Sequence, residues 1–194
     1  MSVKSICWNC ENVIPTDLFL CQICNKIQPP KKVDEFKLMG IPETFDLDLD
    51  ELEKAYLKLQ RLFHPDKYSQ LSDHEIKYST LLSSMINEAY QKLSSSISRA
   101  TILLKLNGFS PHSEDKSFND PDVLEEIMDI QNEFLKAESS EKKKLSIQKL
   151  NLKISETMDN LSISFKNKEY EIANKLNIKL SYLEKIRFNF KKQL

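Results

Sequence analysis

The sequence predicts an all-α fold: a helical hairpin and then a three-helix bundle, preceded by a small four-cysteine module. Apolar residues recur at intervals of three and four along most of the chain after residue 48, which is the period of a helix. Only two of the 194 residues are glycine, too few for a many-turned β-sandwich or a glycine-rich phosphate loop. The segment 122–194 contains neither proline nor glycine, so nearly all of it can be helical.

The charges nearly cancel, with 28 basic and 29 acidic side chains and a net charge of −1. A protein built mainly to neutralise nucleic-acid phosphates would be basic, so we expect no nucleic acid as partner. No apolar run approaches the roughly 20 residues of a membrane span, so we expect no membrane insertion. The first residues contain no secretory signal, which argues against an oxidising extracellular address.

Composition divides the chain into three predicted domains. Residues 1–33 carry every cysteine and end at the adjacent prolines Pro29 and Pro30, which are typical of an extended linker. Residues 34–109 hold two strongly periodic segments and form the second domain. A stretch rich in turn formers then opens the third domain, which we assign to 110–194.

The cysteines form two CxxC pairs separated by ten residues: Cys7, Cys10, Cys21 and Cys24. A CxxC turn lets two thiolates face one ion, and two such turns close a tetrahedral shell. So short a segment has little apolar core, so metal binding would supply most of its folding free energy. The spacing favours one structural zinc per chain. Two reducible disulfides, free thiols and an iron–sulfur cluster are the alternatives.

The second domain is predicted to contain a helical hairpin. One helix runs from about Asp48 to Phe63, with Asp46 or Asp48 as its N-cap, and another runs from about Asp73 to Leu93. The turn between them carries four residues in succession: His64, Pro65, Asp66 and Lys67. One face of the first helix is basic, with residues spaced four and three: Lys54, Lys58 and Arg61. Alone, such a stripe is typical of a solvated surface.

This hairpin resembles the J-domain family of co-chaperones. The resemblance rests on residues 60–68 (QRLFHPDKY) and 86–93 (INEAYQKL), with 36–42 similar to the short first helix of the family. It implies that His64, Pro65 and Asp66 engage a DnaK-type heat-shock ATPase and trigger its ATP hydrolysis. The basic side chains would supply complementary charge that steers the encounter: Lys54, Lys58, Arg61 and Lys67.

The third domain is predicted to be an antiparallel bundle of three amphipathic helices. The first apolar stripe comprises Val123, Ile127, Ile130 and Phe134. The second comprises Leu145, Leu152, Met158, Leu161 and Phe165, and the third Ile172, Leu176, Leu180, Leu183, Ile186 and Phe190. Leu124 and Met128 lie off the first stripe, one turn apart, and are expected to form a neighbouring exposed ridge.

Residues 99–109, 122–131 and 180–187 narrow the resemblance to HscB-type co-chaperones, the J-proteins of iron–sulfur cluster biogenesis. This type has a linker helix after its J-domain, and its eukaryotic members carry a similar tetracysteine extension. It implies contact with an iron–sulfur scaffold protein through Leu124, Met128, Asp129 and Tyr182. Glu125 and Asn132 depart from the residues common there, which puts the extent of the scaffold contact in question. The resemblance also favours the mitochondrial matrix over the cytosol.

Three functions compete at this stage. The first is a non-enzymatic adaptor that activates the ATPase while its bundle delivers the scaffold. The second is a J-protein for another client, and the third a zinc-bearing nucleic-acid module. The His-Asp-Lys turn does not predict an enzyme, because no nucleophile or second group of catalytic residues accompanies it. The sequence is also compatible with a homo-oligomer.

Overall fold

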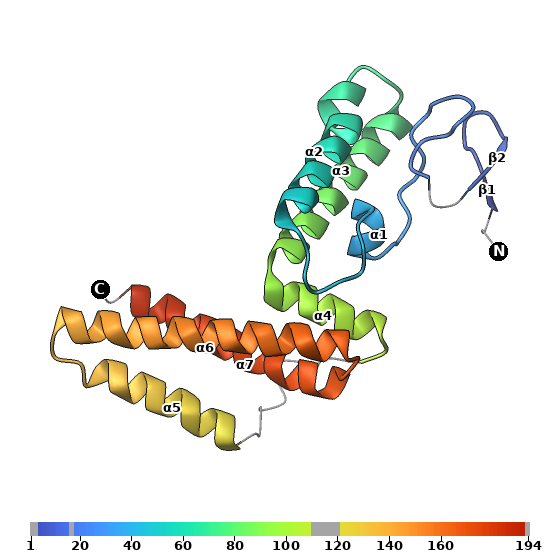
Figure 1. Cartoon of the computed structure of the whole chain (residues 1–194). Coiled ribbons are helices and arrows are strands. Elements are labelled where there is room, and N and C mark those ends of the chain that lie inside the picture. Colours follow the sequence, from blue (N-terminus) through green and yellow to red (C-terminus); the bar gives the residue numbers. More distant parts are fainter. Residues whose placement is uncertain (1–3, 16–17, 110–120, 193–194) are drawn as a thin grey trace. The chain divides into compact units, whose positions relative to one another are not determined.

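The computed structural model describes residues 4–15, 18–109 and 121–192. Its elements are β1 (Lys4–Ile6), β2 (Val13–Pro15), α1 (Glu35–Met39), α2 (Leu49–Phe63), η1 (Pro65–Tyr68), α3 (Asp73–Ser94), α4 (Ser96–Leu106), α5 (Pro121–Leu135), α6 (Ser140–Lys166) and α7 (Tyr170–Lys191) (Figure 1). The all-α prediction is confirmed, since strands in the described residues are limited to the short antiparallel pair β1–β2. The predicted turn-rich stretch 110–120 lies outside the described residues.

The chain divides into two compact units, residues 1–43 with 47–95 and residues 44–46 with 96–194. The first unit holds the cysteine module and the hairpin. Within it α2 and α3 lie side by side, joined by η1 (Figure 1). The N-cap of α2 is Asp48, whose carboxylate accepts from the backbone N–H groups of Asp50 and Glu51. At the end of α1, Gly40 takes φ +67°, a left-handed conformation that suits glycine.

The hairpin is held together by an apolar core and by one aromatic stack. Its buried side chains come from all three helices: Phe36, Leu52, Phe63, Leu82, Ile86 and Leu93. The rings of Tyr56 and Tyr90 stack with centroids 4.3 Å apart. Leu49 of α2 and Leu81 of α3 are apolar but exposed, and so lie outside this core. The α2–α3 hairpin nevertheless has the predicted order and the predicted turn.

The second unit contains α4 as well as the bundle. Helix α4, the predicted linker helix after the hairpin, packs against α7. Two hydrogen bonds join these helices, from Asn177 Nδ2 to Thr101 Oγ1 (3.1 Å) and from the Tyr170 hydroxyl to Asn107 Oδ1 (2.7 Å). The physical reason is that α4 is apolar on the face that meets α7, where Ala100, Leu103 and Leu104 are buried.

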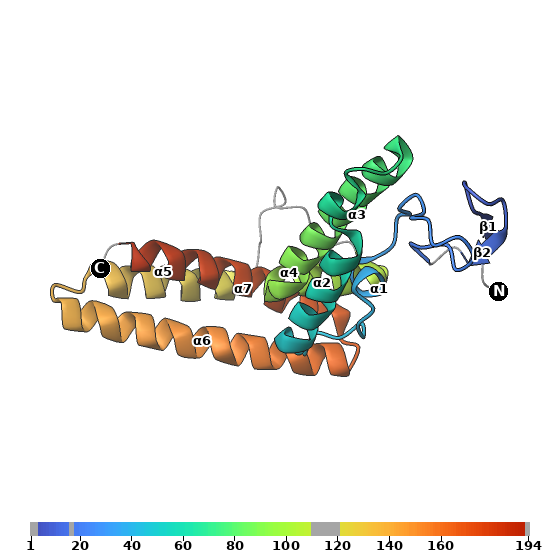
Figure 2. The same cartoon turned by 90° about the horizontal axis from the view of Figure 1, so that it is seen from above.

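The bundle helices α5, α6 and α7 pack against one another (Figure 2). The predicted stripe of α5 faces inward, and its Phe134 stacks on Phe190 of α7 at 3.7 Å. The predicted stripe of α6 is wrong at Leu145 and Leu152, which are exposed. The same holds for Ile172 on α7.

The inward face of α6 mixes apolar side chains with hydroxyls. Its buried residues are Ser146, Ile147, Leu150, Ile154, Thr157, Leu161 and Ser164. Thr157 and Ser164 donate to backbone carbonyls one turn earlier in α6, to Lys153 at 2.7 Å and to Asn160 at 2.9 Å. Because the helix itself satisfies these hydroxyls, they can be buried at little cost. Large apolar residues therefore mark only part of the packed side of α6.

Asp46, the other N-cap candidate, belongs to the second unit. Its carboxylate accepts from Ser162 Oγ and pairs with Lys166, both at 2.7 Å. Beside it, Arg99 donates to the carbonyl of Phe45 at 2.8 Å. These contacts hold residues 44–46 on the second unit. None of the helices in the described part of the chain is long and apolar enough to cross a membrane.

Candidate functional site

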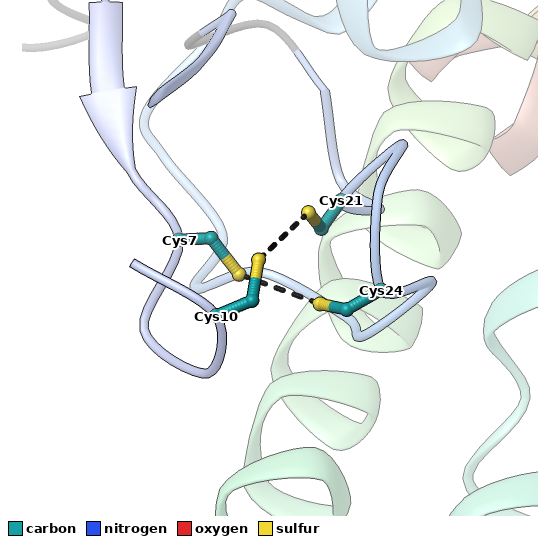
Figure 3. A group of neighbouring side chains, drawn as sticks. All are labelled: Cys7, Cys10, Cys21 and Cys24. Atoms are coloured by element: carbon teal, nitrogen blue, oxygen red, sulfur yellow. Dashed lines mark hydrogen bonds between the residues drawn. The ribbon is translucent and has the colours of Figure 1, made fainter. Parts of the chain in front are cut away.

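The four cysteine sulfurs converge on one point (Figure 3). All four Sγ atoms lie within 4.8 Å of one another. Two sulfur pairs connect one CxxC turn to the other, Cys7 to Cys24 and Cys10 to Cys21, at 3.7 Å each. A zinc ion with Zn–S distances of about 2.3 Å would set tetrahedral S–S edges near 3.8 Å, so the residues fit one such ion. A disulfide, at about 2.05 Å, is not formed between them.

The two CxxC turns have the same backbone structure. The N–H of the first cysteine in each turn donates to a carbonyl five residues on, at 2.9 Å: Cys7 to Asn12 and Cys21 to Lys26. In the fifth position of each turn the backbone is left-handed, with φ +58° at Glu11 and +56° at Asn25. This repeated conformation directs backbone N–H groups toward the sulfurs and sets both turns for one ion.

Burial and local hydrogen bonds shift the pKa values of Cys7 and Cys24 in opposite directions. Burial acts to raise the pKa of Cys7, but the backbone N–H groups of Cys10 and Asn9 outweigh it and lower that pKa to about 6. For Cys24, the backbone N–H of Lys26 acts to lower the pKa, yet burial and the neighbouring thiols raise it to about 11. The Cys7 thiolate is thus favoured while Cys24 resists ionisation, as expected where negative sulfurs crowd together without a cation.

Gln28 completes the surroundings of the sulfurs, and the sequence analysis missed it. Its buried Nε2 donates to Cys7 Sγ at 3.3 Å and to the carbonyl of Lys26 at 2.9 Å. Such a donor stabilises negative charge on a ligating sulfur and fixes its position. The sequence signal that could have identified Gln28 is its position four residues after Cys24.

The four residues of the predicted turn are brought together at the tip of the hairpin. His64 caps η1, and its Nδ1 accepts from the N–H of Asp66 at 3.4 Å. Pro65 occupies the first position of η1, where its fixed φ is favourable. Lys67 Nζ donates to the carbonyl of Arg61 at 2.6 Å, at the end of α2. The carboxylate of Asp66 is 89% exposed, so its acceptor oxygens are open to a partner.

The predicted basic stripe is exposed on α2 and borders a groove. Lys54, Lys58 and Arg61 line it together with Leu57 and Leu62, and its volume is about 390 Å³. We call these five residues the α2 face. The leucines were missed because they lie off the packed stripe. Leu57 is four residues before Arg61 and Leu62 four after Lys58, so helical spacing could have found them.

Asn87 of α3 supports the α2 face through hydrogen bonds to other side chains of α2. Its Oδ1 accepts from Tyr56 Oη at 3.0 Å and from Gln60 Nε2 at 2.7 Å. Gln60 Oε1 in turn accepts from Ser83 Oγ at 3.3 Å. These bonds join α2 to α3 one turn before the His-Pro-Asp turn, and they set the rotation of α2 about its axis. The sequence showed Asn87 only as part of the J-like pattern.

The predicted scaffold residues lie on two helices of the second unit. On α5, Leu124 is 38% and Met128 60% exposed, and Asp129 is exposed beside them. We call these three residues the α5 ridge. Tyr182 lies half-buried on α7. The two residues that depart from the family pattern, Glu125 and Asn132, are both exposed on α5.

Glu126 anchors α5, a role that the sequence did not predict. Its carboxylate pairs with Lys153 of α6 and Lys179 of α7. Burial acts to raise the pKa of Glu126, but the hydrogen bonds from Lys153 and Lys179 outweigh it and lower that pKa. Because residue 126 lies between Leu124 and Met128, this ion-pair network holds the α5 ridge outward.

Comparison with known proteins gives the family. The DnaJ domain model matches residues 34–102, and the model of the HSCB C-terminal oligomerisation domain matches 119–191. The mouse iron–sulfur cluster co-chaperone protein HscB is 33% identical over 195 residues, which cover 98% of this chain and 83% of the mouse protein. The chain belongs to the HscB family of co-chaperones.

Comparisons with further HscB sequences and structures support this family membership. The human iron–sulfur cluster co-chaperone protein HscB is 34% identical over 95% of this chain and 80% of its own length. The crystal structure of the human protein covers 97% of this chain and 98% of that chain, with a TM-score of 0.92 at 33% identity. HscB from Vibrio cholerae follows with a TM-score of 0.73 at 26% identity, covering 82% of this chain and 96% of that one. The relatives are named co-chaperones, and no catalytic activity is indicated by those names.

Proposed function

We propose that this HscB-family chain is a non-enzymatic co-chaperone in iron–sulfur cluster assembly. It stimulates the ATPase of a DnaK-type chaperone through its hairpin, and it brings the cluster scaffold protein to that chaperone through its bundle. The observation that carries the proposal is the exposed His-Pro-Asp turn with the open α2 face beside it, in a chain that also has the HscB C-terminal domain.

The hairpin would act by binding, and the chemistry would stay in the partner's ATPase. Asp66 offers a carboxylate and His64 an imidazole at the tip, while Pro65 keeps the turn rigid. The three basic residues of the α2 face attract an acidic surface of the partner, and Leu57 and Leu62 give it apolar contact. Lys67 braces the turn by donating to Arg61 and adds one more positive charge.

The bundle would bind the scaffold through the α5 ridge and Tyr182. A leucine and a methionine exposed one turn apart form a small apolar surface that can adapt to a partner. Asp129 beside them adds a charge that orients the contact. Glu125, also exposed, adds a second negative charge next to this surface.

We further propose that the cysteine cluster holds one structural zinc per chain. A four-thiolate shell is closed, so the ion would supply folding free energy and leave no open position for a substrate. Metal analysis of the purified protein should give about one zinc per chain. The Cys7→Ser plus Cys24→Ser variant should lose it together with order in the module, and a metal-free chain with an ordered module would contradict the assignment.

The compartment and the assembly state complete the proposal. By family resemblance we propose the mitochondrial matrix as the compartment. Fractionation of cells expressing the tagged chain tests this, and a purely cytosolic signal would contradict it. Light scattering on the pure protein measures self-association through the bundle.

The deciding experiment is a pull-down with the full chain followed by mass spectrometry. Recovery of both a DnaK-type ATPase and an iron–sulfur scaffold is the expected result. Recovery of the ATPase with a different client would favour a J-protein of another pathway. Salt-sensitive capture of RNA or DNA instead would favour a nucleic-acid module.

A further inference from the structure

The cysteine module packs on the hairpin at the two places from which the His-Pro-Asp turn extends. Trp8 meets His74 with ring centroids 5.1 Å apart and Tyr78 at 6.2 Å, in the first two turns of α3. Phe19 meets Phe63, the last residue of α2, edge to face at 6.1 Å. The turn residues 64–72 lie between these two anchor points in the sequence, so both ends of the turn contact the module.

A partly buried ion pair between Lys26 and Glu75 adds a third contact. Glu75, in the first turn of α3, is 3% exposed. Its carboxylate accepts from Ser72 Oγ at 2.8 Å and from Lys26 Nζ at 3.1 Å. A buried carboxylate needs such partners, because an unpaired one would be costly. Lys26 therefore supplies the positive charge that pairs with Glu75 at the start of α3.

Every anchor residue of the module lies within two residues of a clustered cysteine in the sequence. Trp8 follows Cys7, Phe19 comes two residues before Cys21, and Lys26 comes two residues after Cys24. Trp8 is held by a bond from its Nε1 to the carbonyl of Ile27 at 2.6 Å. The CxxC turns thus present the anchors, and their shape depends on the four sulfurs staying together.

We propose that the metal-bound cysteine module is a brace that positions the His-Pro-Asp turn. With the metal in place, Trp8, Phe19 and Lys26 hold the end of α2 and the start of α3 in the geometry that a chaperone can bind. Loss of the metal releases these anchors and loosens the turn, although none of the turn residues contacts the metal. The consequence for chaperone activation rests on the function proposed above, whereas the ordering of the turn does not.

Hydrogen exchange on the full chain tests the brace without any partner. Exchange is compared between the zinc-loaded protein and the protein stripped by a chelator under reducing conditions. Peptides covering 60–80 should exchange about tenfold faster after stripping, while peptides of α5, α6 and α7 stay unchanged. Faster exchange in the module alone, with 60–80 unchanged, would overturn the proposal.

Three lysine variants separate positioning from general loss of folding. Lys26→Met removes the charge and keeps the length of the side chain, Lys26→Arg keeps the charge, and Lys32→Met is the control at an exposed lysine of the linker. In the zinc-loaded state Lys26→Met should speed exchange at 72–78 by about threefold or more, with Lys26→Arg and Lys32→Met near the native rate. Equal exchange in Lys26→Met and Lys32→Met would refute the role of Lys26.

The same variants can then be assayed with a DnaK-type ATPase. Lys26→Met should raise the concentration for half-maximal stimulation about threefold and leave the maximal stimulation native, because the contacting residues are intact. If the native chain does not stimulate the ATPase, the proposed function fails and the exchange data still decide the brace. If the native chain stimulates and stripping changes neither exchange nor stimulation, the brace fails alone.

Discussion

The α2 face and the α5 ridge are both exposed helix surfaces, yet they are built from different side chains. The α2 face alternates three cations with two leucines around a groove. The α5 ridge is a leucine and a methionine with one carboxylate at the side. Long-range attraction by charge falls with added salt, whereas burial of apolar surface does not. One small protein can thus recognise two partners by two different physical effects.

The side chains that support the two surfaces differ in the opposite sense. The α2 face is held by uncharged hydrogen bonds through Asn87. The α5 ridge is held by the ion pairs of Glu126 with Lys153 and Lys179. The α2 face is charged and its support is uncharged, whereas the α5 ridge is mainly apolar and its support is charged. Added salt should therefore act on the contact made by the α2 face and on the ion pairs that support the α5 ridge.

The largest effect is expected at the hairpin tip. Asp66→Asn or His64→Gln should reduce stimulation of the DnaK-type ATPase to the background rate, because the exposed side chains are the contact itself. Circular dichroism and melting temperature should stay native, since an exposed tip carries little stability. Steady-state ATPase assays check this. Stimulation at the native level by both variants would show that the hairpin tip does not contact the ATPase.

The next effect concerns the α5 ridge. Leu124→Ala with Met128→Ala should weaken scaffold binding about tenfold or more, since a few anchors carry most of such a contact. Calorimetric titration should give the same loss of scaffold affinity at low and at high salt. Melting separates surface from core: exposed residues should cost less than about 1 kcal/mol of stability, whereas a packed pair would cost about 4 or more. A salt-dependent loss would contradict the apolar character given to this ridge.

A smaller effect is expected from one charge of the α2 face. Lys58→Glu should slow association with the ATPase several-fold at low salt, and the difference should fade at about 0.5 M salt, where charges are screened within a few ångströms. Lys77→Glu, the same change at an exposed position of α3, is the matched control. Stopped-flow association rates measure both. Equal slowing by the two variants would mean that net charge acts and the α2 face does not.

The smallest effect is expected at the support of the α5 ridge. The pKa of Glu126 lies below its ordinary value of 4.5 in the folded chain, so its ion pairs stabilise the bundle above that pH. This stabilisation is lost as the pH falls through the folded pKa. Glu126→Gln should therefore be about 1 kcal/mol less stable at neutral pH and should lose less stability than the native chain on acidification. Urea unfolding at a series of pH values measures this, and parallel curves for the two proteins would contradict it.

Local patterns predicted much of the fold and most of the site. The CxxC spacing was enough to bring four sulfurs together, because each turn is closed by its own backbone bonds at Asn12 and Lys26. The hairpin was equally local, since Pro65 ends α2 and the capping residues Asp48 and Ser72 start the helices on either side. The exposure of Leu124 and Met128 followed from their position off the packed stripe of α5.

Only the tertiary structure decided which side of each helix is covered, and by which element. The packed side of α6 is only partly apolar, because Thr157 and Ser164 are buried on it and their hydroxyls bond within the helix. The partner of α4 and the anchors Trp8, Phe19 and Lys26 depend on residues tens of positions away, to which helical periodicity gives no access. Periodicity and spacing fix what a segment forms with its own neighbours in the chain, whereas burial and charge pairing depend on what meets it after folding.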